Sequence, residues 1–179
     1  MKRSLILAAA GLFAAVAGGA HLAHARLTVA GPGPLSLIAF LAGEFVGSGE
    51  HSGGFEFEET QVAEWQLSDT VLVVRSKSMV GERQVFEDLR VFSYDIATAE
   101  IRCRQFCFNW VTTYEVEVDE ETGVVTMEES AAEGGKSSKW RYSFTPGAEG
   151  EGFSYELETT DREGAWVGFL GGVLTSKSK

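Results

Sequence analysis

Five polar side chains fall at alternate positions within runs that are otherwise largely apolar, and they have the clearest capacity for chemistry. They lie in the segments 55–67, 70–80 and 84–94, and they are Glu59, Gln61, Ser76, Ser78 and Glu87. An ionised carboxylate in a water-poor interior is costly without a partner, and burial raises its pKa. Such a group can orient the polar head of a ligand, or it can act as a general acid or base. The alternative is that both glutamates lie near an open end, where water satisfies them.

The three segments are joined by short turns that fix which residues face each other. If Ser68-Asp69 and Gly81-Glu82 are two-residue turns, the register of the three strands follows directly. One face is then inward, and it includes Phe57, Val85 and the five polar residues above, while Arg75 and Asp88 oppose each other on a solvated outer face. The expected opposed pairs are Trp65 with Leu72, Ala63 with Val74, Gln61 with Ser76, Ser76 with Glu87, Val74 with Leu89, and Leu72 with Val91.

Aromatic residues dominate the inward positions of the later strands. Alternation places Trp110, Thr112 and Tyr114 inward on one strand, Trp140, Tyr142 and Phe144 on another, and Phe153, Tyr155 and Leu157 on a third. This pattern predicts a pocket with aromatic walls and one polar end. The predicted ligand-binding residues are Phe57, Glu59, Gln61, Trp65, Ser76, Glu87, Tyr114, Trp140, Tyr142 and Phe153.

The strand 100–108 has two possible facings. Either Ile101, Cys103, Gln105 and Cys107 point inward, or Arg102, Arg104, Phe106 and Phe108 do. Pairing across the corner at Asn109 sets Arg102 against Glu115 on a polar face, which favours the first facing. The second facing would place two guanidinium groups in the pocket and change the expected ligand from apolar to anionic.

The two cysteines, Cys103 and Cys107, lie four residues apart in this strand. In a regular strand their Cα atoms are separated by ~13 Å, beyond the reach of a disulfide. A β-bulge could bring them together. We therefore expect two thiols rather than a bridge.

The chain lacks the clusters that catalysis or metal binding would require. After residue 25 the sequence has one histidine, His51, which lies beside Ser52-Gly53-Gly54 and is expected on a surface loop. A zinc site lacks its ligands, and a Ser-His-Asp system would have to use this loop residue. The acidic runs 119–121 and 128–129 fall at turns and strand ends and are expected to be solvated. We predict no catalytic residue, no metal and no cofactor.

These segments belong to a series of short alternating runs that fills the chain after residue 42. Turn residues such as Gly, Asp and Pro separate the runs. The pattern predicts an all-β fold, a single antiparallel up-and-down barrel of about ten strands, with a short helical turn at 35–41 before the first strand. Its charged exterior excludes a transmembrane barrel. The expected strands are 43–50, 55–67, 70–80, 84–94, 100–108, 110–118, 124–130, 138–145, 153–159 and 165–175.

The N-terminal segment has the composition of a cleaved export signal. Lys2 and Arg3 precede an apolar run from Leu5 to Ala17, and Ala23-His24-Ala25 places small residues where a signal peptidase cuts. The run is shorter than the ~20 residues that a spanning helix needs. We expect a signal peptide at 1–25, a leader at 26–34, a barrel domain at 35–179, and a periplasmic or secreted product with no transmembrane segment.

Charge narrows the set of partners. Loss of Lys2 and Arg3 with the signal would take the net charge of the chain from −11 to −13. Nucleic acid and anionic membrane surfaces would be repelled by such a field. We expect no nucleic-acid partner.

One short motif resembles a known family. Gly43-x-Phe45-x-Gly47-x-Gly49, after an apolar turn and before further antiparallel strands, resembles the start of calycin-type barrels. This superfamily includes lipocalins, fatty-acid-binding proteins, nitrobindin-like haem barrels and uncharacterised bacterial relatives, which the stretch from Phe86 to Asp95 also resembles. The resemblance implies the barrel fold and a pocket for a small, largely apolar molecule. Haem binding is not implied, because nitrobindin-like barrels use a late histidine and none follows His51.

Three kinds of function fit these features. The first is an exported, non-catalytic protein that binds a small hydrophobic or amphipathic molecule inside the barrel. The second is an enzyme that uses Glu59 or Glu87 as acid or base, and the third is a structural or partner-binding barrel with a filled core. For the first, we expect neutral or cationic amphiphiles to bind better than fatty acids, because no inward arginine is expected.

Overall fold

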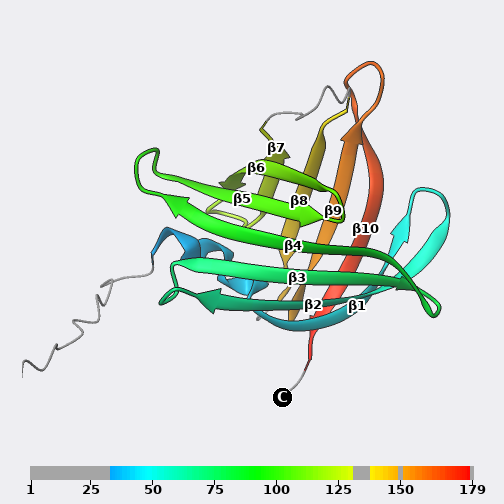
Figure 1. The fold of residues 1–179 in the computed structure, drawn as a ribbon, viewed down its shortest axis with the longest axis horizontal. Helices are drawn as coiled ribbons and strands as arrows, with labels where there is room; N and C mark the ends of the chain where they lie inside the picture. Colours follow the sequence, from blue (N-terminus) through cyan, green and yellow to red (C-terminus); the bar gives the residue numbers. More distant parts are fainter. Residues whose placement is uncertain (1–32, 131–137, 149–150, 178–179) are drawn as a thin grey trace, which may run out of the picture. The chain divides into compact units, whose positions relative to one another are not determined.

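The computed structural model describes residues 33–130, 138–148 and 151–177. The expected signal peptide, 1–25, and the expected leader up to residue 32 lie outside the described residues. Ten antiparallel strands form a closed barrel in which each strand pairs with its neighbours in sequence and β1 pairs with β10 (Figure 1). The all-β barrel expected from the sequence is confirmed. Within the described residues, no helix has the length and apolarity to cross a bilayer.

The strand boundaries lie close to those expected from the alternating runs. The strands are β1 (Gly43–His51), β2 (Phe55–Gln66), β3 (Val71–Val80), β4 (Arg83–Asp95), β5 (Glu100–Cys107), β6 (Trp110–Val118), β7 (Val125–Glu129), β8 (Trp140–Pro146), β9 (Gly152–Thr160) and β10 (Trp166–Ser176).

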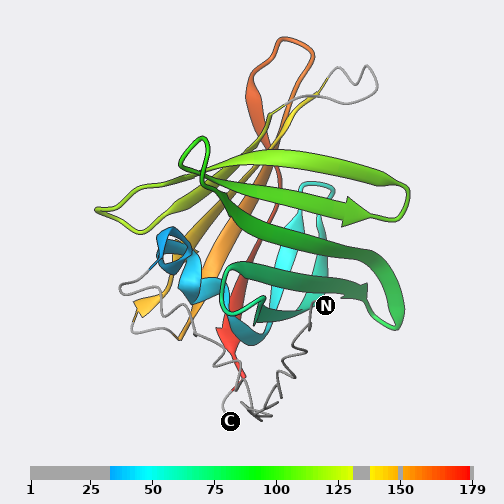
Figure 2. The same cartoon turned by 60° about the vertical axis from the view of Figure 1, so that its left-hand side comes forward.

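A short 3₁₀-helix, η1 (Pro34–Leu41), packs against one end of the barrel. It begins at Pro34 and lies at one end of the barrel in Figure 2. Its apolar residues Leu35, Ile38 and Leu41 are buried, and the helix contacts β3, β4 and β9. Leu72, Phe92, Phe144 and other apolar side chains fill the barrel beside this helix. Because each strand reverses direction, the turns β1–β2, β3–β4, β5–β6 and β9–β10 lie at the opposite end.

The glycines of the opening motif lie where β1 approaches other strands closely. A Cβ atom added to Gly47 would lie 1.9 Å from the Val173 carbonyl oxygen, and one added to Gly49 would lie 2.4 Å from the ring of Phe57. Only glycine fits at such distances without displacement of the backbone or ring. These glycines therefore let β1 lie close to β10 and to the Phe57 ring of β2.

The expected register between β2 and β3 is confirmed. Trp65 faces Leu72, Ala63 faces Val74, and Gln61 faces Ser76. The expected facing of 100–108 is also confirmed, because Ile101, Cys103, Gln105 and Cys107 are buried and Arg102 lies opposite Glu115.

The expected register between β3 and β4 is wrong by one residue over most of its length. Near the turn the expectation holds, with Val80 opposite Arg83 and Met79 opposite Gln84. A register shift between Ser78 and Met79 then leaves Val85 without an opposed residue, which is the geometry of a β-bulge. Beyond it the opposed pairs are Ser78 with Phe86, Ser76 with Asp88, Val74 with Arg90, and Leu72 with Phe92.

This bulge reverses the facing of β4. Asp88, Arg90 and Phe92 are buried, whereas Glu87 is exposed and accepts a hydrogen bond of 2.8 Å from the side chain of Gln84. Glu87 is therefore not an inward carboxylate. The expectation that no arginine points inward is also wrong, because Arg90 does.

Cys103 and Cys107 are buried on the inner face of β5 and are not joined in a disulfide. Burial raises the pKa of the Cys103 thiol, which keeps it protonated and unreactive at neutral pH.

We predict that a thiol reagent such as iodoacetamide will label both cysteines of the denatured protein without prior reduction, and will label the native protein far more slowly. Intact-mass spectrometry measures this, with a reduced sample as the control. A mass two hydrogens lower than expected, without labelling, would show a bridge and a distorted β5.

Candidate functional site

A cavity of about 370 Å³ lies inside the barrel, between the packed end at η1 and the opposite end. Its size is at the lower end of the range for small-molecule pockets. Aromatic side chains form much of its wall, and the polar residues named below come from the five neighbouring strands β2 to β6. The wall includes Phe55, Phe57, Phe86, Trp110, Tyr114, Trp140, Tyr142, Phe144, Tyr155 and Phe169, and the polar residues Glu59, Gln61, Ser76, Ser78, Asp88, Arg90, Gln105 and Thr112.

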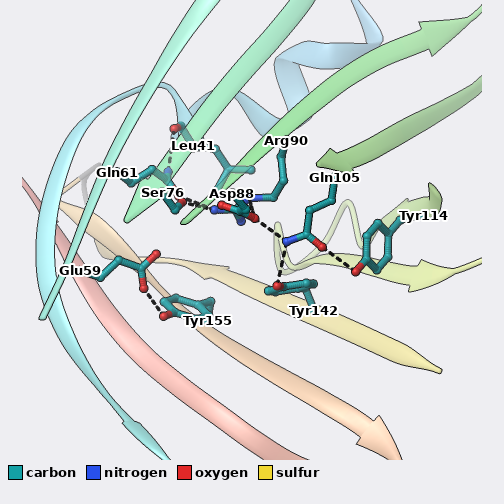
Figure 3. Close-up of polar contacts among 10 residues, drawn as sticks. All are labelled: Leu41, Glu59, Gln61, Ser76, Asp88, Arg90, Gln105, Tyr114, Tyr142 and Tyr155. Carbon is teal, nitrogen blue, oxygen red and sulfur yellow. Dashed lines mark hydrogen bonds and ion pairs between the residues drawn. The ribbon is translucent and has the colours of Figure 1, made fainter. Parts of the chain in front are cut away.

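Arg90 lies at the centre of a buried polar network (Figure 3). Its Nη2 donates to Ser76 Oγ and, at 3.2 Å, to Gln61 Oε1. Ser76 Oγ also donates to Gln61 Oε1 at 3.3 Å, and Gln61 Nε2 donates to the Leu41 carbonyl at 3.4 Å. The network thus links the barrel wall to the end of η1.

Asp88 supplies the counter-charge for Arg90. Asp88 Oδ2 lies 3.2 Å from Arg90 Nε, and the two side chains are only 1% and 5% exposed. Burial alone would lower the pKa of Arg90, but Asp88, Tyr142 and Glu59 outweigh it and raise the pKa, so the guanidinium stays charged. The guanidinium carbon also lies 5.8 Å from the ring centre of Tyr142 and 5.6 Å from that of Phe144.

Gln105 extends the network to the far wall. Its Nε2 donates to Asp88 Oδ2 and, at 3.1 Å, to the Tyr142 hydroxyl, while its Oε1 accepts from the Tyr114 hydroxyl at 2.8 Å (Figure 3). The pKa values of both tyrosines are raised, chiefly by burial, so both keep their protons. The amide is held in one orientation by three neighbours.

Glu59 lies two residues before Gln61 on β2, and in Figure 3 its carboxyl turns toward Tyr155. Its Oε2 accepts a hydrogen bond from the Tyr155 hydroxyl. Burial raises the pKa of Glu59 above its ordinary value of 4.5, although the Tyr155 hydrogen bond and the charge of Arg90 act in the opposite direction. The side chain is therefore easier to protonate than a carboxyl in water.

The end of the cavity away from η1 has an aromatic rim. The ring of His51 stacks on Phe55, with centres 4.5 Å apart, and meets the edge of Phe169 at 4.4 Å. Phe169 in turn lies 4.9 Å from the ring of Trp140. Phe55 and Trp110 are 42% and 41% exposed, so this rim is in contact with solvent.

The structure brings seven of the ten predicted ligand-binding residues onto the cavity wall. They are Phe57, Glu59, Gln61, Ser76, Tyr114, Trp140 and Tyr142.

The other three predicted residues lie elsewhere. Trp65 and Phe153 point inward but belong to the packed end, where Phe153 contacts the rings of Phe45 and Phe40 at 5.1 and 6.1 Å. Glu87 is exposed because the bulge turns it outward.

Of the three Asp, Glu and Arg residues on the cavity wall, Asp88 and Arg90 were not expected from the sequence. Phe86, Asp88, Arg90 and Phe92 are spaced two residues apart, so the sequence shows that they share one face of the strand. It does not show the β-bulge that turns this face inward. The expectation that Glu129 is solvated is also wrong. It is 2% exposed and lies on the same buried face of β7 as Val125 and Met127. Its Oε2 accepts a hydrogen bond of 3.2 Å from the backbone N–H of Trp140.

Metal ligation has little support in the part of the chain that the structure describes. There, no three side chains of His, Cys, Asp or Glu come together as a set that could hold an ion.

Comparisons with known proteins support the fold. No protein-family model matches the chain, and no curated protein matches its sequence. The crystal structure of Rv2717c from M. tuberculosis is similar, with a TM-score of 0.58 and 14% sequence identity over 80% of this chain and 97% of that one. At this identity the likeness shows the barrel fold alone.

The raised pKa of Glu59 predicts a pH-dependent stability difference. The folded protein binds this proton more tightly than the unfolded chain, so the stabilisation is present below pH 4.5 and is lost as the pH rises through the raised value. Glu59→Gln cannot ionise and keeps an acceptor for Tyr155. We expect its melting temperature, relative to the wild type, to increase between pH 4 and pH 8.

Thermal unfolding followed by circular dichroism measures this difference, and Glu87→Gln is the matched control on an exposed glutamate. The control should show no such trend. A Glu59→Gln difference that stays constant or declines with pH would contradict the assignment.

Proposed function

We propose that this protein is an exported, non-catalytic binding protein of the calycin type that holds a small amphipathic molecule inside its barrel. The observation that carries the proposal is the cavity of about 370 Å³, with aromatic walls and a buried polar network on one side. Aromatic walls contribute burial at ~25 cal/mol per Å² of apolar surface, and a few fixed polar groups orient the ligand.

A filled, purely structural core is the weaker alternative. The apolar core leaves a cavity inside the barrel, and core residues such as Phe57, Tyr142 and Leu157 form part of its wall. A barrel that served only as a scaffold would gain stability from filling this space with apolar groups. Polar side chains there instead cost desolvation, which favours a binding role.

Catalysis by Glu59 is a second candidate. Its carboxyl is buried on the cavity wall, has a raised pKa and accepts a hydrogen bond from Tyr155, which is the environment of many general acids. Glu87 has no place in this candidate because it is exposed. The binding role is preferred, because the aromatic cavity wall supports it directly, whereas catalysis would rest on the Glu59–Tyr155 pair.

Export rests on the N-terminal sequence. The charged start, the apolar run from Leu5 to Ala17 and the Ala23-His24-Ala25 site together favour cleavage after Ala25. The location proposed is periplasmic or secreted, where a carrier would meet small molecules from outside the cell.

Expression of the full chain in a bacterium with a standard secretion pathway should yield a protein that begins at Arg26. Intact-mass spectrometry and N-terminal sequencing of the periplasmic fraction measure this, and a variant with Ala23 and Ala25 both changed to Gln is the control. A full-length product retained in the cytoplasm would contradict export.

A bulky side chain placed inside the cavity should weaken ligand binding. Ser78 lies on the cavity wall and is 7% exposed, so Ser78→Phe puts a ring into the space that a ligand needs. We expect the affinity for the neutral fluorescent probe N-phenyl-1-naphthylamine to fall at least tenfold, while the circular dichroism spectrum is unchanged.

Lys77→Phe is the matched control, because Lys77 is the neighbouring residue of β3 and points outward. Its affinity for the probe should equal that of the wild type. Equal binding by Ser78→Phe, or no binding of the probe to the wild type, would contradict a ligand site in the barrel interior.

A further inference from the structure

We propose that the polar head of the bound molecule is an amine or a hydroxyl group that donates a hydrogen bond to Asp88 Oδ1. Amphiphiles with a carboxylate head then bind less tightly. This inference rests on the proposed function and specifies the chemistry of the ligand's polar head. It follows from which atoms of the polar network are engaged and which are not.

Asp88 Oδ1 is a buried acceptor whose capacity is unused. The residue is 4% exposed, and its other oxygen, Oδ2, accepts from Gln105 Nε2 and pairs with Arg90 Nε. Oδ1 has no hydrogen-bond partner among the described residues. A buried carboxylate oxygen without a donor is unfavourable, so a donor supplied by a ligand would gain more here than at a solvated site.

The position of Asp88 suits the head of an amphiphile. Asp88 lies on the cavity wall opposite Ser76 and is 4% exposed, whereas the rim residues Phe55 and Trp110 are 42% and 41% exposed. A head at Asp88 would leave the tail among Phe57 and the other aromatic residues of the wall. The tail would then point toward the solvent-exposed rim, which is the direction of entry.

Among the described residues that line the cavity, Arg90 is the one Arg or Lys. Its charge is paired with that of Asp88. Its Nη2 donates to Gln61 and Ser76, and its Nε makes no hydrogen bond within the described part of the chain but lies within ion-pair distance of Asp88 Oδ2, at 3.2 Å. The same wall also carries the carboxyl of Glu59. A ligand carboxylate would therefore enter a space with two acidic side chains and one arginine whose Nε and Nη2 already face protein acceptors.

We therefore still expect neutral or cationic amphiphiles to bind better than fatty acids, but for a different physical reason. The first basis, that no arginine points inward, is wrong. The new basis is that Arg90 is engaged by its neighbours and that Asp88 offers an acceptor.

Four ligands with the same tail separate the head chemistries on the wild-type protein. They are octylamine and 1-octanol, which donate a hydrogen bond, and octyl methyl ether and octanoate, which do not at neutral pH. Isothermal titration calorimetry should show that each donor binds at least tenfold more tightly than octanoate, and that 1-octanol binds more tightly than its ether. About tenfold is the smaller effect expected for a hydrogen bond to a charged group.

Asp88→Asn and Glu87→Gln form a matched pair, because the two residues are adjacent in β4 and one faces the cavity while the other is exposed. Each variant removes one negative charge from the same strand. The ratio of octylamine to octanoate affinity should fall at least tenfold in Asp88→Asn and stay unchanged in Glu87→Gln. If Asp88→Asn does not fold, as judged by circular dichroism, the wild-type series decides.

The outcomes distinguish this inference from the proposed function. Binding of N-phenyl-1-naphthylamine with octanoate equal to or tighter than octylamine would overturn the role of Asp88 and leave the binding function intact. An unchanged affinity ratio in a folded Asp88→Asn variant would do the same. Absence of binding by the probe and all four octyl compounds would overturn both.

Discussion

The buried ion pair between Asp88 and Arg90 is the constraint on which the interior of this barrel depends. Removing two charges from water costs several kcal/mol for each ion, and their mutual attraction offsets this only when further hydrogen bonds satisfy them. Gln61 and Ser76 accept hydrogen bonds from Arg90 Nη2, and Gln105 donates one to Asp88 Oδ2, from three other strands. The register brings the pair together with these partners, and it places a polar layer beside the packed apolar end.

The polar layer depends on a single extra residue. The bulge at Val85 separates the part of β4 that follows the turn from the part that carries Asp88 and Arg90. Without it, Glu87 and the apolar residues Leu89 and Val91 would face inward, and the interior would hold no guanidinium. Bulges are common near functional sites because they redirect side chains in this way. The second register shift, between Gly168 and Leu170, lies beside Phe169 on the aromatic rim and has a similar effect on β10.

Much of the fold could be predicted from the sequence because its signals are local. Alternation and turn composition gave the ten strands, and the Arg102–Glu115 pair correctly oriented β5. The facing of β4 could not be predicted in the same way, because both of its faces mix charged and apolar residues. Its true inner face is acceptable only because Asp88 and Arg90 compensate each other and find partners on distant strands. Alternation of side chains shows which face of a strand points inward, but it does not show how deep a residue lies along the barrel axis. Trp65 and Phe153 therefore point inward as expected but lie at the packed end rather than on the cavity wall.

A crystal structure of the protein, purified from the expressing cells without refolding, tests the central claim most directly. The account predicts a bulge at Val85, Asp88 and Arg90 paired inside the barrel, and electron density for a small molecule between Phe57 and Tyr142 with a polar atom near Asp88 Oδ1. Glu87 inside the barrel, or apolar side chains closing the cavity, would contradict it.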